Sequence, residues 1–126
     1  YRGISMKNTS CSKWLVFEAP NSQPNARFKI KPLNNPEYSL AMVNLTLVSR
    51  DLSAVDFFNQ FAEIVSHHLV TDWENISFKE NGELIDVDYS PENALKLFLM
   101  GNLGLEILNW IVASAFSLNS EMSEGA

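Results

Sequence analysis

The sequence is poor in the residues that build covalent and metal-based scaffolds. Cys11 is the single cysteine among 126 residues, so an internal disulfide and a zinc site with several cysteine ligands are both excluded. One lone thiol also suits a reducing compartment. The first residues lack an apolar run followed by small residues, so no export signal is predicted. Residues 1–5 precede Met6, and we interpret them as additional residues upstream of the native start.

Positive charge is scarce in the second part of the chain. The formal net charge is −6, and residues 51–126 hold two Lys/Arg against thirteen Asp/Glu, whereas residues 1–50 hold seven against two. Sequence-independent binding to nucleic acid requires several cations on one face. No nucleic-acid partner is therefore predicted, and a local basic strand at Arg27, Lys29 and Lys31 is the remaining alternative.

A long uninterrupted hydrophobic run is also lacking. Residues 94–118 are the most apolar stretch, but four polar or charged residues interrupt it: Lys96, Asn102, Glu106 and Asn109. No window of about twenty apolar residues remains, so a membrane span is rejected. We expect a helix from Pro91 to about Met100, a corner over Gly101 to Gly104, and a second helix from about Leu105 to Leu118. A disordered acidic tail is expected from about residue 119 to residue 126.

Length and composition favour one α+β domain. With 126 residues and 46% hydrophobic content, the chain can bury roughly two-thirds of its unfolded surface in a single core. We predict a predominantly helical single domain with a short antiparallel hairpin at about residues 76–88 and one or two strands near the N-terminus. Residues 1–12 are expected to fray.

The strongest local signal is Asn81-Gly82 between two strand-like runs, which predicts a two-residue hairpin turn. With these two residues as the turn, four apolar side chains fall on one face: Ile76, Phe78, Ile85 and Val87. Ser90-Pro91 then predicts the capped start of a helix. We expect the flanking helices to cover the hairpin, which would make residues 69–98 the centre of the fold.

Two strands and two helices are predicted upstream. Trp14 to Phe17 form a compact apolar run, and Phe28 and Ile30 alternate with basic residues, so each segment indicates a strand. Asn35 and Pro36 are typical of a helix start.

Residues 38–48 beyond this start fit both a helix, by the spacing of Leu40, Val43 and Leu47, and a strand, by the alternation of Val43, Leu45 and Leu47. The cap favours the helix. Ser53 predicts the start of another helix, whose apolar stripe runs to Leu69.

No catalytic, cofactor or metal motif is legible. His67 and His68 are adjacent, and on a helix they point about 100° apart, so they cannot bind one ion together from that element. Asp86 to Glu92 resembles the start of a calcium loop, but the glycine and glutamate that such a loop requires are replaced by Pro91 and Leu97. We predict a protein that is not an enzyme and needs no cofactor.

Three motifs follow one another in a fixed order along the chain. They are Phe28-x-Ile30-x-Pro32-Leu33-x-Asn35-Pro36-Glu37-Tyr38-x-x-Ala41, then Leu69-Val70-x-Asp72-Trp73-x-x-Ile76 with Asn81-Gly82-x-Leu84, then Tyr89-Ser90-Pro91-Glu92-Asn93-Ala94 before an apolar helix. In this order they resemble the small tail assembly chaperones of long-tailed bacteriophages and prophages. The resemblance covers roughly residues 27–118. It departs from the family before Arg27 and in the dense apolar segment from Ile107 to Phe116.

The resemblance implies a non-enzymatic protein in the cytoplasm of the bacterial host that keeps the tape-measure protein soluble during tail assembly. The over-apolar C-terminal helix is the expected client or self-association face, through Ile107, Trp110, Ile111 and Leu118. The acids from Asp51 onward would keep such a complex dispersed. A homo-oligomer is a further expected assembly. The alternatives are a structural subunit of the tail or virion and a small ligand-binding domain around Trp73 and Tyr89.

Overall fold

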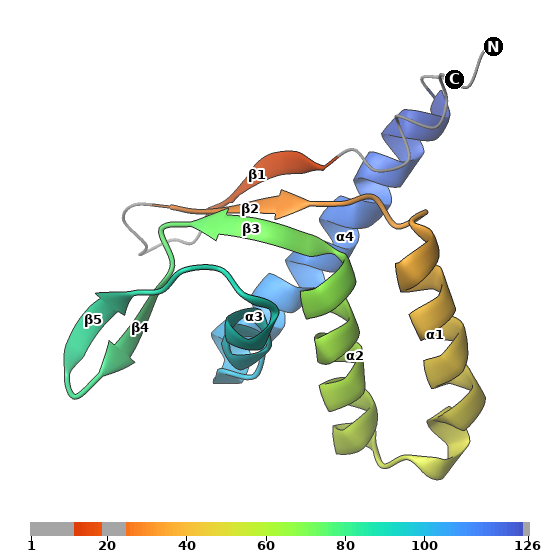
Figure 1. Ribbon diagram of the computed structural model, residues 1–126, viewed down its shortest axis with the longest axis horizontal. Helices are drawn as coiled ribbons and strands as arrows, with labels where there is room; N and C mark the ends of the chain where they lie inside the picture. Colours follow the sequence, from red (N-terminus) through yellow and green to blue (C-terminus); the bar gives the residue numbers. More distant parts are fainter. Residues whose placement is uncertain (1–11, 19–24, 125–126) are drawn as a thin grey trace.

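Residues 12–18 and 25–124, which the computed structural model describes, form two small antiparallel sheets and a set of helices (Figure 1). In chain order the elements are β1 (Lys13–Phe17), β2 (Ala26–Ile30), α1 (Pro36–Val48), the 3₁₀ turn η2 (Ser49–Asp51), α2 (Ala54–His68), β3 (Val70–Glu74), β4 (Ser77–Glu80), β5 (Glu83–Asp86), α3 (Pro91–Phe98) and α4 (Gly101–Glu124). This is the predicted predominantly helical α+β domain. The frayed segment expected at residues 1–12 lies almost entirely outside the described residues.

The main sheet has three antiparallel strands in the order β1-β2-β3. Alternation along β2 buries Ala26, Phe28 and Ile30 and turns Arg27 and Lys29 to the opposite face. The two strands predicted from the N-terminal sequence are thus confirmed. β3 is not predicted from the sequence, because the apolar residues that continue the stripe of α2 also fit one more helical turn.

The core lies between this sheet and α4, which passes behind the sheet in Figure 1. Trp110 of α4 packs its ring edge-on against Phe17 of β1, with ring centroids 5.3 Å apart, and lies 5.8 Å from Phe28 of β2. Phe28 in turn makes an edge-on contact with Trp73 of β3 at 6.2 Å. Aromatic residues from all three strands and α4 therefore form one cluster, with α2 and α3 packed beside it.

The turn between α3 and α4 corrects the predicted corner. α3 ends at Phe98, and Gly101 starts α4 with a φ of +63°, so the chain turns at Leu99 and Met100 rather than over Gly101 to Gly104. Gly104 lies inside α4. The predicted helix end at Leu118 is also wrong, because α4 continues to Glu124 where a disordered tail was expected; residues 125–126 lie outside the described residues.

The described helices can be compared with the length and hydrophobicity that a membrane span requires. Within residues 12–18 and 25–124, no single helix is both long and apolar enough to cross a bilayer. α3 and α4 taken together reach that threshold by length and composition, but the chain bends by 118° between them.

The hairpin β4–β5 is present with its predicted register, but it is not the centre of the fold. Asn81 and Gly82 have φ values of +54° and +86°, as a type I′ turn requires, and Phe78 pairs with Ile85. Ile85 is 43% exposed and Leu84 is 75% exposed. The two strands pair only with each other and extend away from the rest of the chain in Figure 1. The three-stranded sheet occupies the central place because it presents a wider apolar face to the helices.

Three helices begin at the side-chain caps that the sequence predicts. The Oδ1 of Asn35 accepts the N–H of Tyr38 (2.8 Å), Ser53 Oγ accepts the N–H of Asp56 (3.0 Å), and Ser90 Oγ accepts the N–H of Asn93 (3.0 Å), in cap positions of α1, α2 and α3 respectively. Pro36 and Pro91 occupy first-turn positions where a missing N–H leaves no hydrogen bond unmade. The ambiguous segment after Asn35 is therefore a helix.

Candidate functional site: the exposed face of α1 and its groove

Among the described side chains, α1 carries more exposed large apolar residues than any other helix. Leu40, Val43 and Leu47 are 63%, 55% and 75% exposed, and their spacing places them on one side of the helix. We call these three residues the α1 face. Leu45 is the one residue of α1 that is buried, at 3% exposure. The helix is thus apolar on the side that packs against α2 and also on the side that faces outward.

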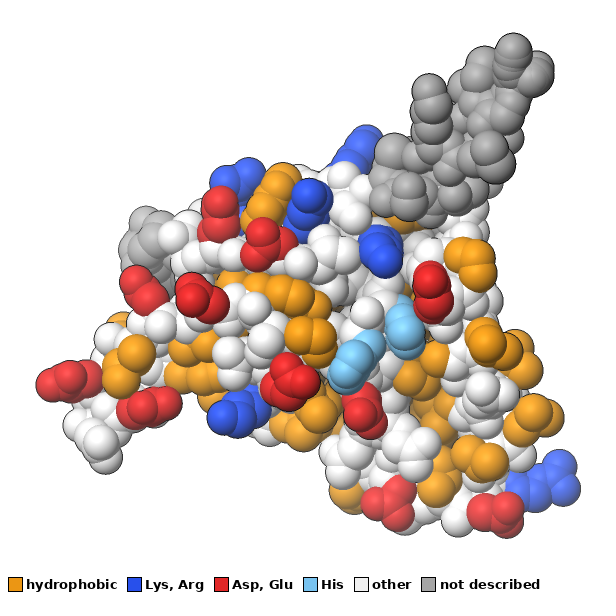
Figure 2. Space-filling model, in the orientation of Figure 1, with side chains coloured by type: hydrophobic (Ala, Val, Ile, Leu, Met, Phe, Trp, Pro, Cys, Tyr) orange, Lys and Arg blue, Asp and Glu red, His pale blue; other side chains and the backbone are white. Residues whose placement is uncertain are grey.

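A groove runs between α1 and α2 beside this face, with a volume of about 470 Å³. Its lining comes from both helices: Ala41, Asn44, Leu45, Val48, Gln60, Glu63, Ile64, His67 and His68. α1 supplies a mainly apolar wall and α2 a mainly polar one. Val48 lines the groove and Leu47 belongs to the α1 face, and because consecutive residues of a helix point about 100° apart, the groove and the face lie on neighbouring sides of α1. Figure 2 shows the pale-blue histidines at this groove and hydrophobic side chains continuing over α1.

A buried asparagine fixes the position of α1 relative to α2. Asn35 is 3% exposed, and its Nδ2 donates to the carbonyl oxygens of Pro32 (3.0 Å) and of His68 at the end of α2 (3.3 Å), in addition to the cap that its Oδ1 provides. One side chain therefore holds the start of α1 and the end of α2 together. The groove begins from this fixed point.

The two histidines of the groove have separate environments. The His67 ring nitrogen Nδ1 lies 2.9 Å from the carbonyl oxygen of Glu63 and 3.3 Å from Ser66 Oγ. Burial lowers the pKa of His68, the neighbouring His67 and Lys31 lower it further, and the carboxylate of Glu37 opposes the shift. Within the part of the chain that the structure describes, no group of three or more His, Cys, Asp and Glu side chains is placed to hold a metal ion.

The face predicted on α4 lies mostly inside the protein. Ile107, Ile111 and Leu118 are 4%, 0% and 5% exposed, and Trp110 is half-buried in the aromatic cluster with Phe17 and Phe28. These residues therefore belong to the core of the chain. The exposed large apolar residues described on α4, Leu103, Leu105 and Phe116, are not spaced as neighbours on one side of that helix, whereas three of those on α1 form the α1 face. The signal for it is in the sequence, since apolar residues surround α1 on more sides than one core contact can bury.

The neighbourhood of Trp73 and Tyr89 contains a cleft of about 440 Å³, lined by Asp72, Trp73, Glu74, Asn75, Ile76, Asp86, Val87, Asp88 and Tyr89. The polar atoms of both aromatic side chains are engaged internally. Trp73 Nε1 donates to the carbonyl oxygen of Val87 (2.8 Å), and the Tyr89 hydroxyl lies within hydrogen-bond distance of the carbonyl oxygens of Ser66 (3.0 Å) and Val70 (2.7 Å). Burial, with smaller contributions from Asp72 and Glu92, raises the pKa of Tyr89 to about 12. These contacts hold the segment that precedes α3 against α2 and β3.

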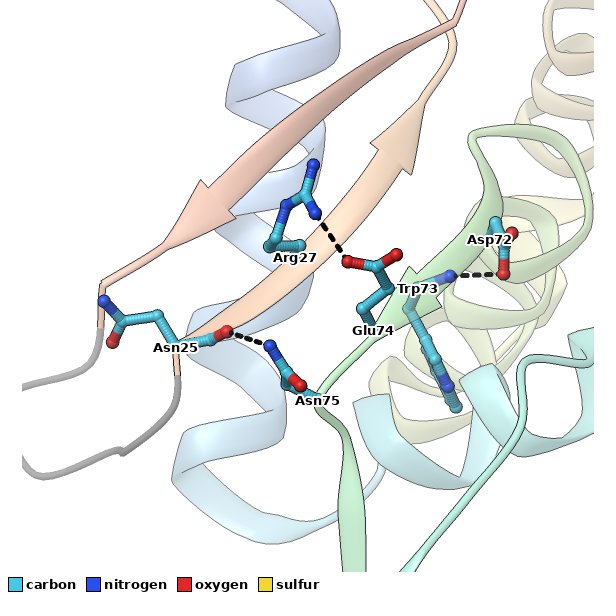
Figure 3. Close-up of polar contacts among 6 residues, drawn as sticks. All are labelled: Asn25, Arg27, Asp72, Trp73, Glu74 and Asn75. Carbon is cyan, nitrogen blue, oxygen red and sulfur yellow. Dashed lines mark hydrogen bonds and ion pairs between the residues drawn. The ribbon is translucent and has the colours of Figure 1, made fainter.

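The basic residues of β2 lie beside acidic residues of β3. Arg27 forms a 2.6 Å ion pair with Glu74 on the adjacent strand, and its guanidinium lies 4.9 Å from the centre of the Trp14 ring. Figure 3 shows this pair at the sheet surface, beside the 3.0 Å bond from Asn75 Nδ2 to the carbonyl oxygen of Asn25. Lys29 lies opposite Asp72 in the register. Acids of β3 thus accompany the cations of β2.

Comparison with known proteins places the chain in a family. The family model of the YdaY prophage protein matches residues 30–125, about three-quarters of the sequence, and the match includes α1, the groove and the whole of α4. The chain belongs to the YdaY prophage protein family. Its prophage origin agrees with the phage character that the sequence resemblance implied. No curated protein and no solved structure is significantly similar to the chain.

Proposed function

We propose that this prophage protein is a non-enzymatic tail assembly chaperone that binds a helical segment of the tape-measure protein. The proposal combines three observations: the resemblance of residues 27–118 to tail assembly chaperones, the prophage family, and the α1 face with its groove. The third observation gives the proposal its physical content, because it identifies a surface on which a client can bind.

The α1 face and groove have the chemistry of a helix-binding surface. An amphipathic helix is recognised through apolar side chains spaced at three or four residues, laid against a hydrophobic groove. Leu40, Val43 and Leu47 repeat at that spacing, and the groove beside them adds the apolar side chains of Val48 and Ile64. A client helix bound here would contact the apolar wall of α1 with its apolar stripe and the polar side chains of α2 with the residues that flank this stripe.

The charge of the chain suits a protein that keeps an apolar client dispersed. The formal net charge is −6, and acids predominate after residue 50. Two complexes that both carry this charge repel each other, which opposes the co-aggregation of exposed apolar segments. The α1 face would then bind the client while the remaining surface keeps the complexes apart.

Co-expression tests the proposal. The tape-measure protein encoded by the same prophage is produced alone, with this chain, with a Leu47→Glu variant, and with a Leu84→Glu variant as the control. Leu47 and Leu84 are both 75% exposed, so the two substitutions place the same charge on equally accessible positions of α1 and of the hairpin. We expect the wild-type chain and the Leu84→Glu variant to keep the client soluble and to co-purify with it, and the Leu47→Glu variant to fail.

Two results would contradict the proposal. If the tape-measure protein is equally soluble without this chain, no chaperone is needed. If the chain is present in stoichiometric amounts in finished tails, it is a structural subunit of the particle rather than a transient chaperone.

A further inference from the structure

We propose that a second copy of this chain binds to the α1 face in an antiparallel, two-fold symmetric arrangement when no client is present. The three exposed side chains of this face are arranged almost symmetrically along α1: Leu40 and Leu47 lie on either side of Val43. A C2 interface requires a surface that is complementary to itself. A short apolar stripe with this internal symmetry meets that requirement.

An antiparallel arrangement about a two-fold axis near Val43 and Asn44 brings Leu40 of one copy next to Leu47 of the other, twice by symmetry. The central Val43 side chains of the two copies then approach each other at the axis. Each of the three exposed side chains thereby gains an apolar neighbour without any change in the fold. The helix can approach closely because none of residues 38–49 carries a charge.

The charges at the ends of α1 select the orientation. Glu37 lies in the first turn of α1, and Arg50 follows the end of the helix. Antiparallel pairing places the Glu37 end of one copy beside the Arg50 end of the other, whereas parallel pairing would bring like charges together. Asp51 follows Arg50 and offsets its charge, so the apolar stripe supplies the affinity, and the direction comes from keeping the two Glu37 carboxylates apart.

The size of the face determines how strong the dimer is. Three side chains of one helix cover less than the roughly 800 Å² per partner of a standard stable interface. The dimer is therefore weak and dependent on concentration, and it exchanges rapidly. If the α1 face also binds the client, a consequence that rests on the proposed function, the second copy masks that face until the client competes for it. Dimer formation itself does not depend on the proposed function.

Analytical ultracentrifugation of the isolated full chain tests the dimer. We expect the wild-type chain and the Leu84→Glu variant to pass from monomer to dimer as the concentration rises. The Leu47→Glu variant should stay monomeric over the same range, because each dimer would place two carboxylates among apolar side chains. Circular dichroism checks that both variants are folded. A wild-type chain that stays monomeric at the highest concentration, or a Leu47→Glu variant that dimerises normally, would overturn the proposal.

Disulfide trapping tests the orientation. In a Cys11→Ser background, a Leu40→Cys variant is mixed with a Leu47→Cys variant and oxidised, with Leu84→Cys as the exposed control. We expect the mixed disulfide between positions 40 and 47 to exceed both homodisulfides, and a Val43→Cys variant to cross-link with itself. A predominance of homodisulfides at positions 40 and 47, or cross-linking no greater than that of the control, refutes the antiparallel interface. If these tests fail while co-expression still yields a soluble client, the dimer is wrong and the proposed function is retained.

Discussion

Replacing Gly104 with alanine is expected to destabilise the protein, although alanine is the better helix former. Gly104 lies buried in α4, directly against the last turn of α3. A Cβ atom added here would lie 2.7 Å from the carbonyl oxygen and 2.9 Å from the carbonyl carbon of Phe98, and still closer to the carbonyl oxygen of Leu97. These contacts are with backbone atoms, which cannot move aside as the end of a flexible side chain can.

Two effects of opposite sign determine the size of the change. Alanine in place of glycine in a helix interior stabilises by about 1 kcal/mol. Forcing an extra carbon into a tightly packed contact costs typically 1–3 kcal/mol, and more where backbone has to shift. Since the Gly104 contacts involve three backbone atoms of α3, we expect the steric cost to exceed the gain. The net loss should be on the order of 1–2 kcal/mol in the free energy of unfolding.

Urea denaturation followed by circular dichroism measures this loss, and thermal unfolding should show a decrease in Tm of roughly 4 °C per kcal/mol. Ala113→Gly is the control, because Ala113 lies on the exposed side of the same helix. That variant should lose about 1 kcal/mol from helix propensity alone. If Gly104→Ala is as stable as the wild type or more stable, the close approach of α3 and α4 is not a constraint, and the reasoning is refuted.

Variants at three further positions test the polar contacts by chemical or pH denaturation. Asn35→Ala removes a helix cap and leaves two carbonyl oxygens without their donor, so a loss of roughly 2–4 kcal/mol is expected. Asn35→Asp keeps the capping oxygen but places a carboxylate oxygen against the same two carbonyl oxygens in a buried site, so it should also be destabilised, and wild-type stability in this variant would contradict the role of the Nδ2 contacts. Tyr89 has a pKa raised from 10.0 to about 12. Its contribution to the free energy of unfolding is therefore complete below pH 10 and is lost as the pH rises towards 12. The stability of Tyr89→Phe should decline less steeply in this alkaline range. The pKa of His68 is lowered from 6.5, so its contribution is complete above pH 6.5 and is lost as the pH falls below that value; a His68→Gln variant with an unchanged acid decline would disprove this assignment.

The features that the sequence predicted well are those that a few neighbouring residues determine. The caps at Asn35, Ser53 and Ser90 each depend on an oxygen and an N–H three residues later, so the start of each helix could be located. The Asn81-Gly82 turn is equally local, since both residues tolerate positive φ. Such signals need no knowledge of the tertiary structure.

The features that the sequence predicted poorly depend on contacts between distant segments. β3 is a strand because it pairs with β2, more than forty residues earlier in the chain. The exposed apolar face was predicted on α4 for the same reason. α1 and α4 are both rich in apolar residues, and composition alone does not show which of the two helices is covered by the rest of the chain. α4 is buried because it lies against the sheet, where Trp110 meets Phe17 and Phe28. α1 contacts mainly α2, and its outer side therefore stays exposed.

The isolation of the β4–β5 hairpin has a consequence for protein engineering. Ile76 and Phe78, at its base, are buried in the core and Val87 packs against it, whereas its tip is exposed. Exposed loop tips are the sites that best tolerate inserted residues. A peptide tag or a small folded domain joined between Asn81 and Gly82 should therefore leave the sheet, α4 and the α1 face in place. This position offers a point at which the chain can be labelled while both of its proposed interactions remain measurable.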